Sequence, residues 1–396
     1  MTIQKIFTRD FIFCFASQFA FTSVSFILVP TLPIYLSRLG STEIEIGILI
    51  GAYGISSLVL RPVVGKALSK IPEKKFMIAG AILFTLASVA YLMAPPFWPF
   101  FIVRLFQGIG SAFFFTAAIL LISNIAPETY RGQSLGYFFL SFNISMALAP
   151  PFGIFLVNHY GFAILFLVCA VLSLSSLLIS SKLKTSDVKP MGDSPTEGSS
   201  FFDRKAFPPI FVYFLAHIIW GALATFFPLH AIHHGVTNPG LFFAAYAVVL
   251  ILGRALGGRI LDIQRREKVI LPCLTAYVVA MTVLAFSKSH EMFILVAVIQ
   301  ATGHAFLMPI LVVYTLDLAG SSRGASIGFL SGAGDLGMVL GPIMMGIILR
   351  FTDFRSMFLC VALIGLMNFA YFYSSVKKQK SRQGTPKSGR FRQMSN

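Results

Sequence analysis

The sequence predicts an all-α membrane protein of twelve transmembrane helices, built as two parallel six-helix repeats with both termini cytoplasmic. Its composition, its apolar stretches and an internal repeat lead to this fold class. Hydrophobic residues make up 56% of the chain and charged residues 12%, whereas a soluble protein has about 25% charged residues. Such a chain cannot cover a water-facing surface with polar groups, so most of its surroundings must be lipid.

Twelve stretches are long and apolar enough to cross a bilayer, which takes about 20 predominantly apolar residues. Some exceed one crossing and are expected to tilt or protrude. The first stretch is too long for a signal-peptide core and has no clear small-residue cleavage site, so we expect a retained helix. The stretches are 11–36, 44–64, 76–94, 97–124, 133–157, 162–181, 208–232, 240–260, 269–287, 291–319, 325–349 and 356–376.

The basic residues indicate how the chain is oriented. Most of the 31 Lys and Arg residues fall in the termini and the even-numbered loops. Basic loops stay cytoplasmic, so both termini are expected inside, in a multi-pass protein of the cytoplasmic (inner) membrane. The net charge of +16 therefore indicates orientation rather than a nucleic-acid partner. The exceptions are Arg38, Lys288, Arg350 and Arg355 on the other side, and Arg61, Arg104 and Arg254 within spans.

A polar segment divides the chain into two halves. The loop from Lys182 to Ser200 is rich in Ser, Pro and Gly, a composition typical of a linker. The predicted units are an N-terminal six-helix bundle (1–181), a linker (182–207), a C-terminal six-helix bundle (208–376) and a basic tail (377–396). We expect the tail to lie near anionic lipid.

The two halves resemble each other. The segment RGQSLGYFFLSFNISMALAPP begins at Arg131, and RGASIGFLSGAGDLGMVLGPI begins 192 positions later at Arg323. Arg61 with Gly65 matches Arg254 with Gly258 at an offset of 193. Because an even number of spans separates the copies, they have the same orientation in the membrane. They are parallel repeats related by an axis along the membrane normal.

Motifs within these repeats resemble those of the major facilitator superfamily. In that family's loop motif, a Gly is followed four residues later by Asp and then by a basic cluster. The first copy has Gly65, Lys70, Lys74 and Lys75, with Ser69 in place of the Asp. The second copy keeps the whole pattern, at Gly258, Asp262, Arg265, Arg266 and Lys268.

Two further motifs carry the same resemblance. RLFQGIGSA looks like the family's Arg-x-x-Gln-Gly-x-Gly motif. LGPIMMG resembles its antiporter motif, Gly-Pro-x-x-x-Gly, and ALAPPFG is a weakened copy with Ala149 in place of the first Gly. The matching residues are Arg104, Gln107, Gly108 and Gly110 for the first motif, and Gly341, Pro342 and Gly346 for the second.

This resemblance, closest to bacterial proton-linked exporters, implies a secondary transporter that alternates between inward-open and outward-open states. The expected partners are a small-molecule substrate, protons and the bilayer, and we expect a monomer with no cofactor. A proton-driven symporter for uptake and a non-transporting membrane sensor are the alternatives. No constellation in the sequence indicates an enzyme. The spacing of HAIHHG (230–235) suits a metal, but no acidic or Cys partner is near, so no metal is predicted.

By the resemblance, spans 1, 4, 7 and 10 line the central cavity. Arg104 lies about 10 Å inside its span. It is expected to bind an anionic group or couple to protons, unless it snorkels outward or ties helices together through carbonyls. The histidines either titrate near neutral pH or are simply hydrogen-bonded. The predicted cavity residues are Gln18, Arg104, Gln107, His217, Trp220, Gln300 and His304.

The loop motifs predict a cytoplasmic latch. Asp262 can pair with a basic neighbour or with the N-terminus of a facing helix; simple positive-inside charge is the alternative. Ser69 cannot make the ionic contact, so the first latch is expected to be weaker. The predicted latch residues are Arg61, Gly65 and Lys70 in the first half, and Arg254, Gly258, Asp262 and Arg265 in the second.

Glycine and proline residues predict close helix packing. Gly334, Gly337 and Gly341 share one helical face, and small residues let helix backbones approach closely in lipid. By the resemblance, this face lies where the two bundles meet and serves their rocking, although ordinary packing would need the same face. The predicted packing residues are Pro150, Gly153, Gly337, Gly341, Pro342 and Gly346.

Asp335 is the one acid that the sequence places deep in a span, roughly 15 Å from the cytoplasmic end. Its repeat partner is Asn143, so both halves have a polar side chain at this depth. We predict that Asp335, together with Arg104, couples transport to protons. The alternative is a protonated or hydrogen-bonded Asp that pins its helix to a neighbour.

Overall fold

The computed structural model is all-helical in the part of the chain that it describes: residues 7–127, 130–184, 206–263, 266–318 and 323–383. The first half contains α1 (Arg9–Arg38), α2 (Glu43–Ala67), α3 (Glu73–Ala90), α4 (Trp98–Ile125) and α5 (Arg131–Ser181). The second half contains α6 (Phe207–His233), α7 (Gly240–Ile263), α8 (Arg266–Phe286), α9 (His290–Leu318), α10 (Arg323–Phe351) and α11 (Phe354–Gln383).

Helix α5 contains two of the predicted stretches. Gly161 has φ 80° and ψ 177°, which interrupts the helix. Only glycine adopts such a backbone conformation readily. The stretches 133–157 and 162–181 fall on either side of this bend, so α5 runs along the molecule and back again.

Nine of the described helices are long and apolar enough to cross a membrane, with α5 counted once. The apolar part of α7, Gly240–Ala255, is shorter, and α3 is not among the nine. Helix α11 continues to Gln383, beyond the predicted end of its span at residue 376. Most of the predicted linker and the end of the predicted tail lie outside the described residues.

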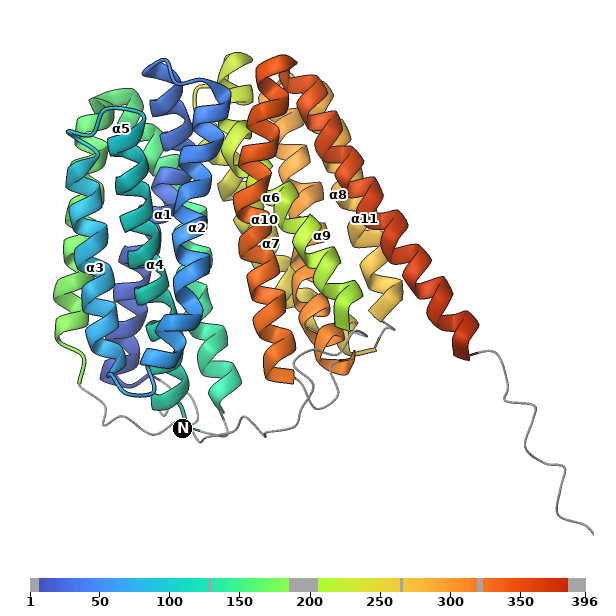
Figure 1. Ribbon diagram of the computed structural model, residues 1–396, viewed down its shortest axis with the longest axis horizontal. Helices are drawn as coiled ribbons and strands as arrows, with labels where there is room; N and C mark the ends of the chain where they lie inside the picture. Colours follow the sequence, from blue (N-terminus) through green and yellow to red (C-terminus); the bar gives the residue numbers. More distant parts are fainter. Residues whose placement is uncertain (1–6, 128–129, 185–205, 264–265, 319–322, 384–396) are drawn as a thin grey trace, which may run out of the picture.

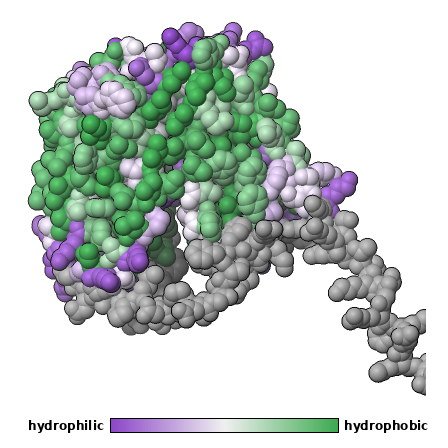
Figure 2. All heavy atoms as spheres, viewed as in Figure 1, coloured by the Kyte–Doolittle hydropathy of each residue, from purple (hydrophilic) through white to green (hydrophobic). Residues whose placement is uncertain are grey.

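The helices form two groups side by side, α1–α5 and α6–α11 (Figure 1). The start of α1 and the end of α11 lie at the same end of the molecule (Figure 1); we call this the terminal end and the opposite one the far end. Figure 2 shows a mostly hydrophobic face along the helices, with hydrophilic residues towards the two ends. Leu86, Val171 and Leu363 are among the large hydrophobic residues exposed on the molecule.

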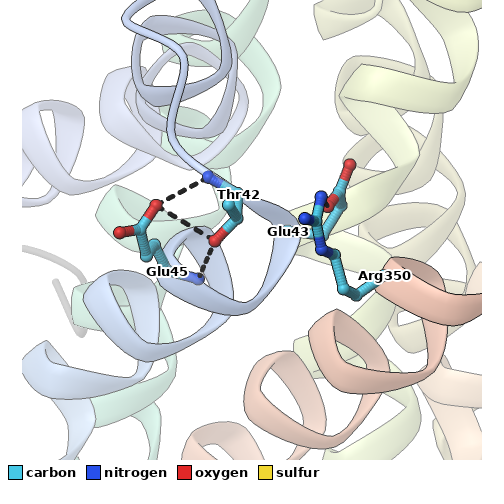
Figure 3. Close-up of polar contacts among 4 residues, drawn as sticks. All are labelled: Thr42, Glu43, Glu45 and Arg350. Carbon is cyan, nitrogen blue, oxygen red and sulfur yellow. Dashed lines mark hydrogen bonds and ion pairs between the residues drawn. The ribbon is translucent and has the colours of Figure 1, made fainter.

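The far end of α2 is fixed by a capping box (Figure 3). The backbone N–H of Thr42 donates to the Glu45 carboxylate at 2.7 Å, and the backbone N–H of Glu45 donates to the Thr42 hydroxyl at 3.3 Å. These reciprocal bonds satisfy backbone donors that a helix start otherwise leaves free. They set where α2 begins, directly beside its contact with the second half.

Candidate functional site

At the far end, α2 and α10 approach so closely that glycine is required. A Cβ on Gly47 would collide with the Pro342 carbonyl, and one on Gly346 would lie 2.5 Å from the Glu43 carbonyl oxygen. Gly51 packs against Val339 and Ile343 in the same way. The sequence analysis missed Gly47 and Gly51, although their four-residue spacing is a known signal for close helix packing in lipid.

The contact between α5 and α7 repeats this geometry. Gly240 packs on the backbone of Pro150 and Pro151, and the internal repeat relates Gly240 to Gly47 and Pro150 to Pro342. Two amides join α5 to the segment just before α7: Asn158 donates to the Thr237 carbonyl at 2.9 Å, and Asn238 donates to the Pro151 carbonyl at 3.4 Å. The sequence repeat is thus also a repeat of contacts between the halves.

The predicted glycine face of α10 packs elsewhere than expected. A Cβ on Gly337 would lie 2.5 Å from the Phe214 carbonyl oxygen, and one on Gly334 would lie 2.5 Å from the Tyr213 ring. Gly341 packs against Ile218. These partners all belong to α6, so the face lies within the second half rather than between the halves. This corrects the expected placement, because it is the opposite side of α10, with Asp335 and Val339, that faces α2.

Gly153 is likewise a contact within one half. Its Cβ position lies 3.1 Å from the Ile27 side chain on α1. Pro150, Pro342 and Gly346 are the predicted packing residues that do touch the other half.

An ion pair joins the two halves through α2 and α10. Arg61 Nη1 donates to Asp335 Oδ2 at 2.6 Å, and the two side chains are 35% and 20% exposed. Asp335 lies about 18 Å along α10 from its terminal end. The structure therefore brings together a residue that the sequence predicted as a latch and one that it predicted for proton coupling.

This ion pair lies where close packing between α2 and α10 ends. Nearer the terminal end, a Cβ on Gly65 or Gly328 would meet no atom within 4 Å. On the far side of the pair, Gly47, Gly51 and Gly54 all press against α10. Among the described residues, the tight glycine contacts between α2 and α10 thus all lie on the far side of Arg61 and Asp335.

The other predicted latch residues make no comparable contact in the described part of the chain. Lys70 is exposed, and the Ser69 hydroxyl donates to the Lys66 carbonyl of its own helix turn at 2.8 Å. Arg254 is exposed and has no carboxylate partner among the described residues. The surroundings of Gly258, the side chain of Asp262 and all of Arg265 lie outside the described residues.

Arg104 is buried in a network inside the first half. Its guanidinium donates to the carbonyls of Leu49 and Ile50 on α2, both at 3.0 Å, and to Gln107 at 2.7 Å. The Tyr91 hydroxyl also donates to Gln107, at 2.6 Å. With its side chain only 6% exposed, Arg104 ties α2 to α4, as the carbonyl-clamp alternative anticipated.

Two predicted cavity residues, Trp220 and His304, belong to an aromatic cluster in the second half. The rings of Trp220 and Tyr246 are 4.7 Å apart, and those of Trp220 and His304 are 5.8 Å apart. His304 Nδ1 is 2.8 Å from the Tyr277 hydroxyl. One turn before Trp220 on α6, His217 is hydrogen-bonded to the Tyr213 carbonyl at 2.8 Å. We define Trp220, Tyr246, Tyr277 and His304 as the aromatic cluster; sequence analysis missed its tyrosines.

Gln18 and Gln300 are fully buried. Neither amide group has a hydrogen-bond partner among the described residues. Gln107, the repeat counterpart of Gln300, is hydrogen-bonded to Arg104 and Tyr91. The residues equivalent to Arg104 and Tyr91 in the second half are Ala297 and Leu284, whose side chains cannot form such bonds. No ring contact or hydrogen bond in the described chain links Gln18 to the aromatic cluster.

Comparisons with known proteins place these observations in a family. The model of the Major Facilitator Superfamily matches residues 14–263 and 209–395. The staphylopine export protein of Staphylococcus aureus is 25% identical over 88% of this chain and 92% of its own. Multidrug resistance protein 1 of Bacillus subtilis is 23% identical over 81% and 85%. The crystal structure of nucleoside transporter NupG has a TM-score of 0.75 at 14% identity, over 93% of this chain and 100% of that one, which shows a shared fold.

Proposed function

Because the chain belongs to the Major Facilitator Superfamily and is a membrane transporter of that family, we propose that it exports a small molecule in exchange for protons. In this proposal it acts as a monomer in the cytoplasmic membrane. All twelve predicted stretches cross the membrane, and the terminal end of the molecule faces the cytoplasm. Relatives named for export and for multidrug resistance support the outward direction.

In this orientation the structure corresponds to an inward-facing state. The contacts of Gly47 with Pro342 and of Gly240 with Pro150 close the far, external end. A parted cytoplasmic end is supported by Gly65 and Gly328, whose Cβ positions would meet no described atom within 4 Å. Export requires the reverse arrangement as well, so both glycine contacts must open once per cycle as one half rocks against the other.

The observation that carries the proton coupling is the Arg61–Asp335 ion pair. Both partners are needed for its stability, since a lone charge within the membrane is costly. A proton on Asp335 neutralises the carboxylate and removes its attraction for Arg61. Proton binding therefore changes the free energy of the contact between the halves, and by linkage the arrangement of the halves changes the proton affinity of Asp335.

The residues have distinct roles in this scheme. Arg61 and Asp335 couple the proton to the movement of α2 against α10. His217 and the aromatic cluster form the substrate-facing wall of the second half. Arg104 and Gln107 hold α2 on α4, so that the first half moves as one body and Arg61 moves with it.

To test the proposed exchange, the substrate is identified first, and its transport is then measured under a pH gradient. Metabolite profiles of cells that lack the protein, compared with cells that overproduce it, identify the molecule that is retained or lost. That molecule is then followed in everted vesicles while the pH difference is changed. Uptake into the vesicles should rise with internal acidification. Flux that ignores the gradient would eliminate proton exchange, and flux in the opposite sense would show symport.

A further inference from the structure

Arg254, on α7, is the repeat counterpart of Arg61. Its side chain is exposed, and it forms no ion pair among the described residues. A cation within a membrane span is costly unless it has a partner or water. The question is therefore which anion satisfies this guanidinium.

The side chain does not point into the lipid. The exposed residues Leu241, Val248 and Leu252 mark the outer face of α7. At 3.6 residues per turn, position 254 lies about 120–160° around the helix from all three. Tyr246, whose ring lies 4.7 Å from that of Trp220 on α6, is within about a quarter turn of Arg254 around α7. Its side chain therefore lies on the inner side of α7, towards the space between the halves.

The internal repeat shows what is missing opposite Arg254. Arg61 pairs with Asp335, and the residues equivalent to this pair are Arg254 and Asn143. The neighbouring contacts obey the same correspondence, because Gly47 on Pro342 matches Gly240 on Pro150. Asn143 is an amide and brings no charge. The second half thus keeps the cation of the pair but has lost its built-in counter-ion.

No other acid in the described part of this region compensates Arg254. Arg61, Asp335 and Arg254 are the charges at these repeat-related positions, and Asp335 is already bound to Arg61 at 2.6 Å. This group of charges between the halves is left with one net positive charge, on Arg254.

The surroundings of Arg254 suit an amphipathic molecule. Tyr246 lies about two turns before Arg254 on α7, roughly 12 Å along the helix. Its ring is fully buried against Trp220, yet its hydroxyl has no hydrogen-bond partner among the described residues. Aromatic rings provide an apolar wall for a ligand, and a few polar groups orient it.

Building on the proposed function, we propose that Arg254 binds the anionic group of an amphipathic cargo, most simply a carboxylate, whose apolar part lies against the aromatic cluster. A guanidinium forms two parallel hydrogen bonds with a carboxylate. The substrate thereby supplies the counter-ion that Asp335 supplies in the first half. An anionic lipid headgroup has the same charge and is the competing occupant.

The chain contains a built-in reporter for this site. It has two tryptophans, and Trp98 is 70% exposed at the start of α4. In the full-length Trp98→Phe protein, fluorescence reports on Trp220 alone. We would titrate this protein in phosphatidylcholine nanodiscs with 4-nitrobenzoate and with the uncharged 4-nitrobenzamide, both quenchers of similar shape. The carboxylate should bind about tenfold or more tightly than the amide.

Three variants test the assignment. Arg254→Gln should abolish the preference for the carboxylate, whereas Arg254→Lys should keep part of it. Asn143→Asp should also weaken carboxylate binding, since it restores the missing internal partner. Unchanged quenching by the amide shows that each variant is folded. A full carboxylate preference in Arg254→Gln would overturn the proposal.

Two further comparisons separate the explanations. If phosphatidylglycerol in the nanodiscs displaces 4-nitrobenzoate, the occupant is a lipid headgroup and the assignment to cargo is overturned; if it does not, the cargo assignment stands. If the wild-type protein shows proton-driven flux but does not prefer the carboxylate to the amide, the role of Arg254 is refuted and the proposed function stands. A carboxylate preference that depends on Arg254, in a protein whose flux ignores pH, refutes the proposed coupling alone.

Discussion

The α2–α10 and α5–α7 interfaces have the same packing but opposite electrostatics. Each places a glycine at the far end of one helix on a proline of the other: Gly47 on Pro342, and Gly240 on Pro150. Yet the two charged residues of α10 that reach α2, Asp335 and Arg350, have asparagines as their repeat counterparts. The two interfaces thus share their mechanics, and only one of them contains charges that respond to protons.

This difference assigns separate tasks to the two interfaces. Asparagine side chains do not titrate near neutral pH, so neither Asn143 nor Asn158 gives the α5–α7 contact a charge that depends on pH. The Arg61–Asp335 pair loses its attraction once a proton binds. In the proposed function, the symmetric packing lets the halves rock, and the asymmetric charge makes that rocking depend on protons.

The largest expected effect on transport comes from giving both interfaces the same residue at the repeat-related positions 335 and 143. Asp335→Asn puts there the residue that already occupies the equivalent position, Asn143, so the protein should remain folded. It should nevertheless lose all dependence of flux on the pH gradient, because no proton acceptor is left in the pair. Flux in everted vesicles at several imposed gradients measures this.

Asp353→Asn is the matched control. Asp353 lies outside the spans, and the backbone N–H of Ser356 donates to its carboxylate at 2.7 Å. This bond lowers the pKa of Asp353, so the group stays ionised near neutral pH. Its substitution should leave the pH response intact. Equal loss in both variants would mean that any acid suffices and would remove the special role of Asp335.

The next largest effect tests the shared packing. Gly47→Ala places a methyl group against the Pro342 carbonyl, and Gly240→Ala places one against Pro150 and Pro151. Overpacking costs about 1–3 kcal/mol, so each change should reduce closure of the far end, and hence flux, by about tenfold. The measurement compares the loss of flux in Gly47→Ala with that in Gly240→Ala, and the two losses should be similar.

Gly328→Ala serves as the control for added volume, because its Cβ would meet nothing within 4 Å. It should transport normally. If Gly47→Ala were harmless while Gly240→Ala blocked transport, the two interfaces would not share their mechanics.

The smallest effect is expected at the far-end ion pair. Arg350 Nη1 lies 3.6 Å from Glu43 Oε2, and the side chains are 52% and 39% exposed (Figure 3). Exposed pairs contribute about 0–1 kcal/mol, so Glu43→Gln should change flux by less than about fivefold. Its dependence on pH should not change. A lost pH response in Glu43→Gln would move the coupling from Asp335 to the far end.

Much of this architecture can be predicted from the sequence, because lipid imposes strong patterns. Apolar length locates the helices, the repeat identifies the halves, and an acid such as Asp335 stands out in an apolar span. The pairing of Arg61 with Asp335 cannot be read in this way. It depends on how α2 and α10 are rotated against each other, and the two residues are separated by 274 positions.

The same reason explains the misplaced glycine face. Helix α10 has small residues on more than one side, and the spacing of Gly334, Gly337 and Gly341 gives their face but not its partner. For Arg104, the sequence left a cavity role and a clamp open. In the structure Arg104 makes the contacts of a clamp, because it donates to the carbonyls of Leu49 and Ile50. The sequence pattern does not show such contacts with backbone groups of a distant helix.

The central claim can be tested without any substrate. Spin labels at positions 63 and 329, in a background without the four native cysteines, would report the distance between the inner parts of α2 and α10 as pH is lowered. In the otherwise wild-type protein the distance distribution should shift as Asp335 takes up a proton. In Asp335→Asn it should be the same at every pH. A wild-type pH response in Asp335→Asn would contradict the account.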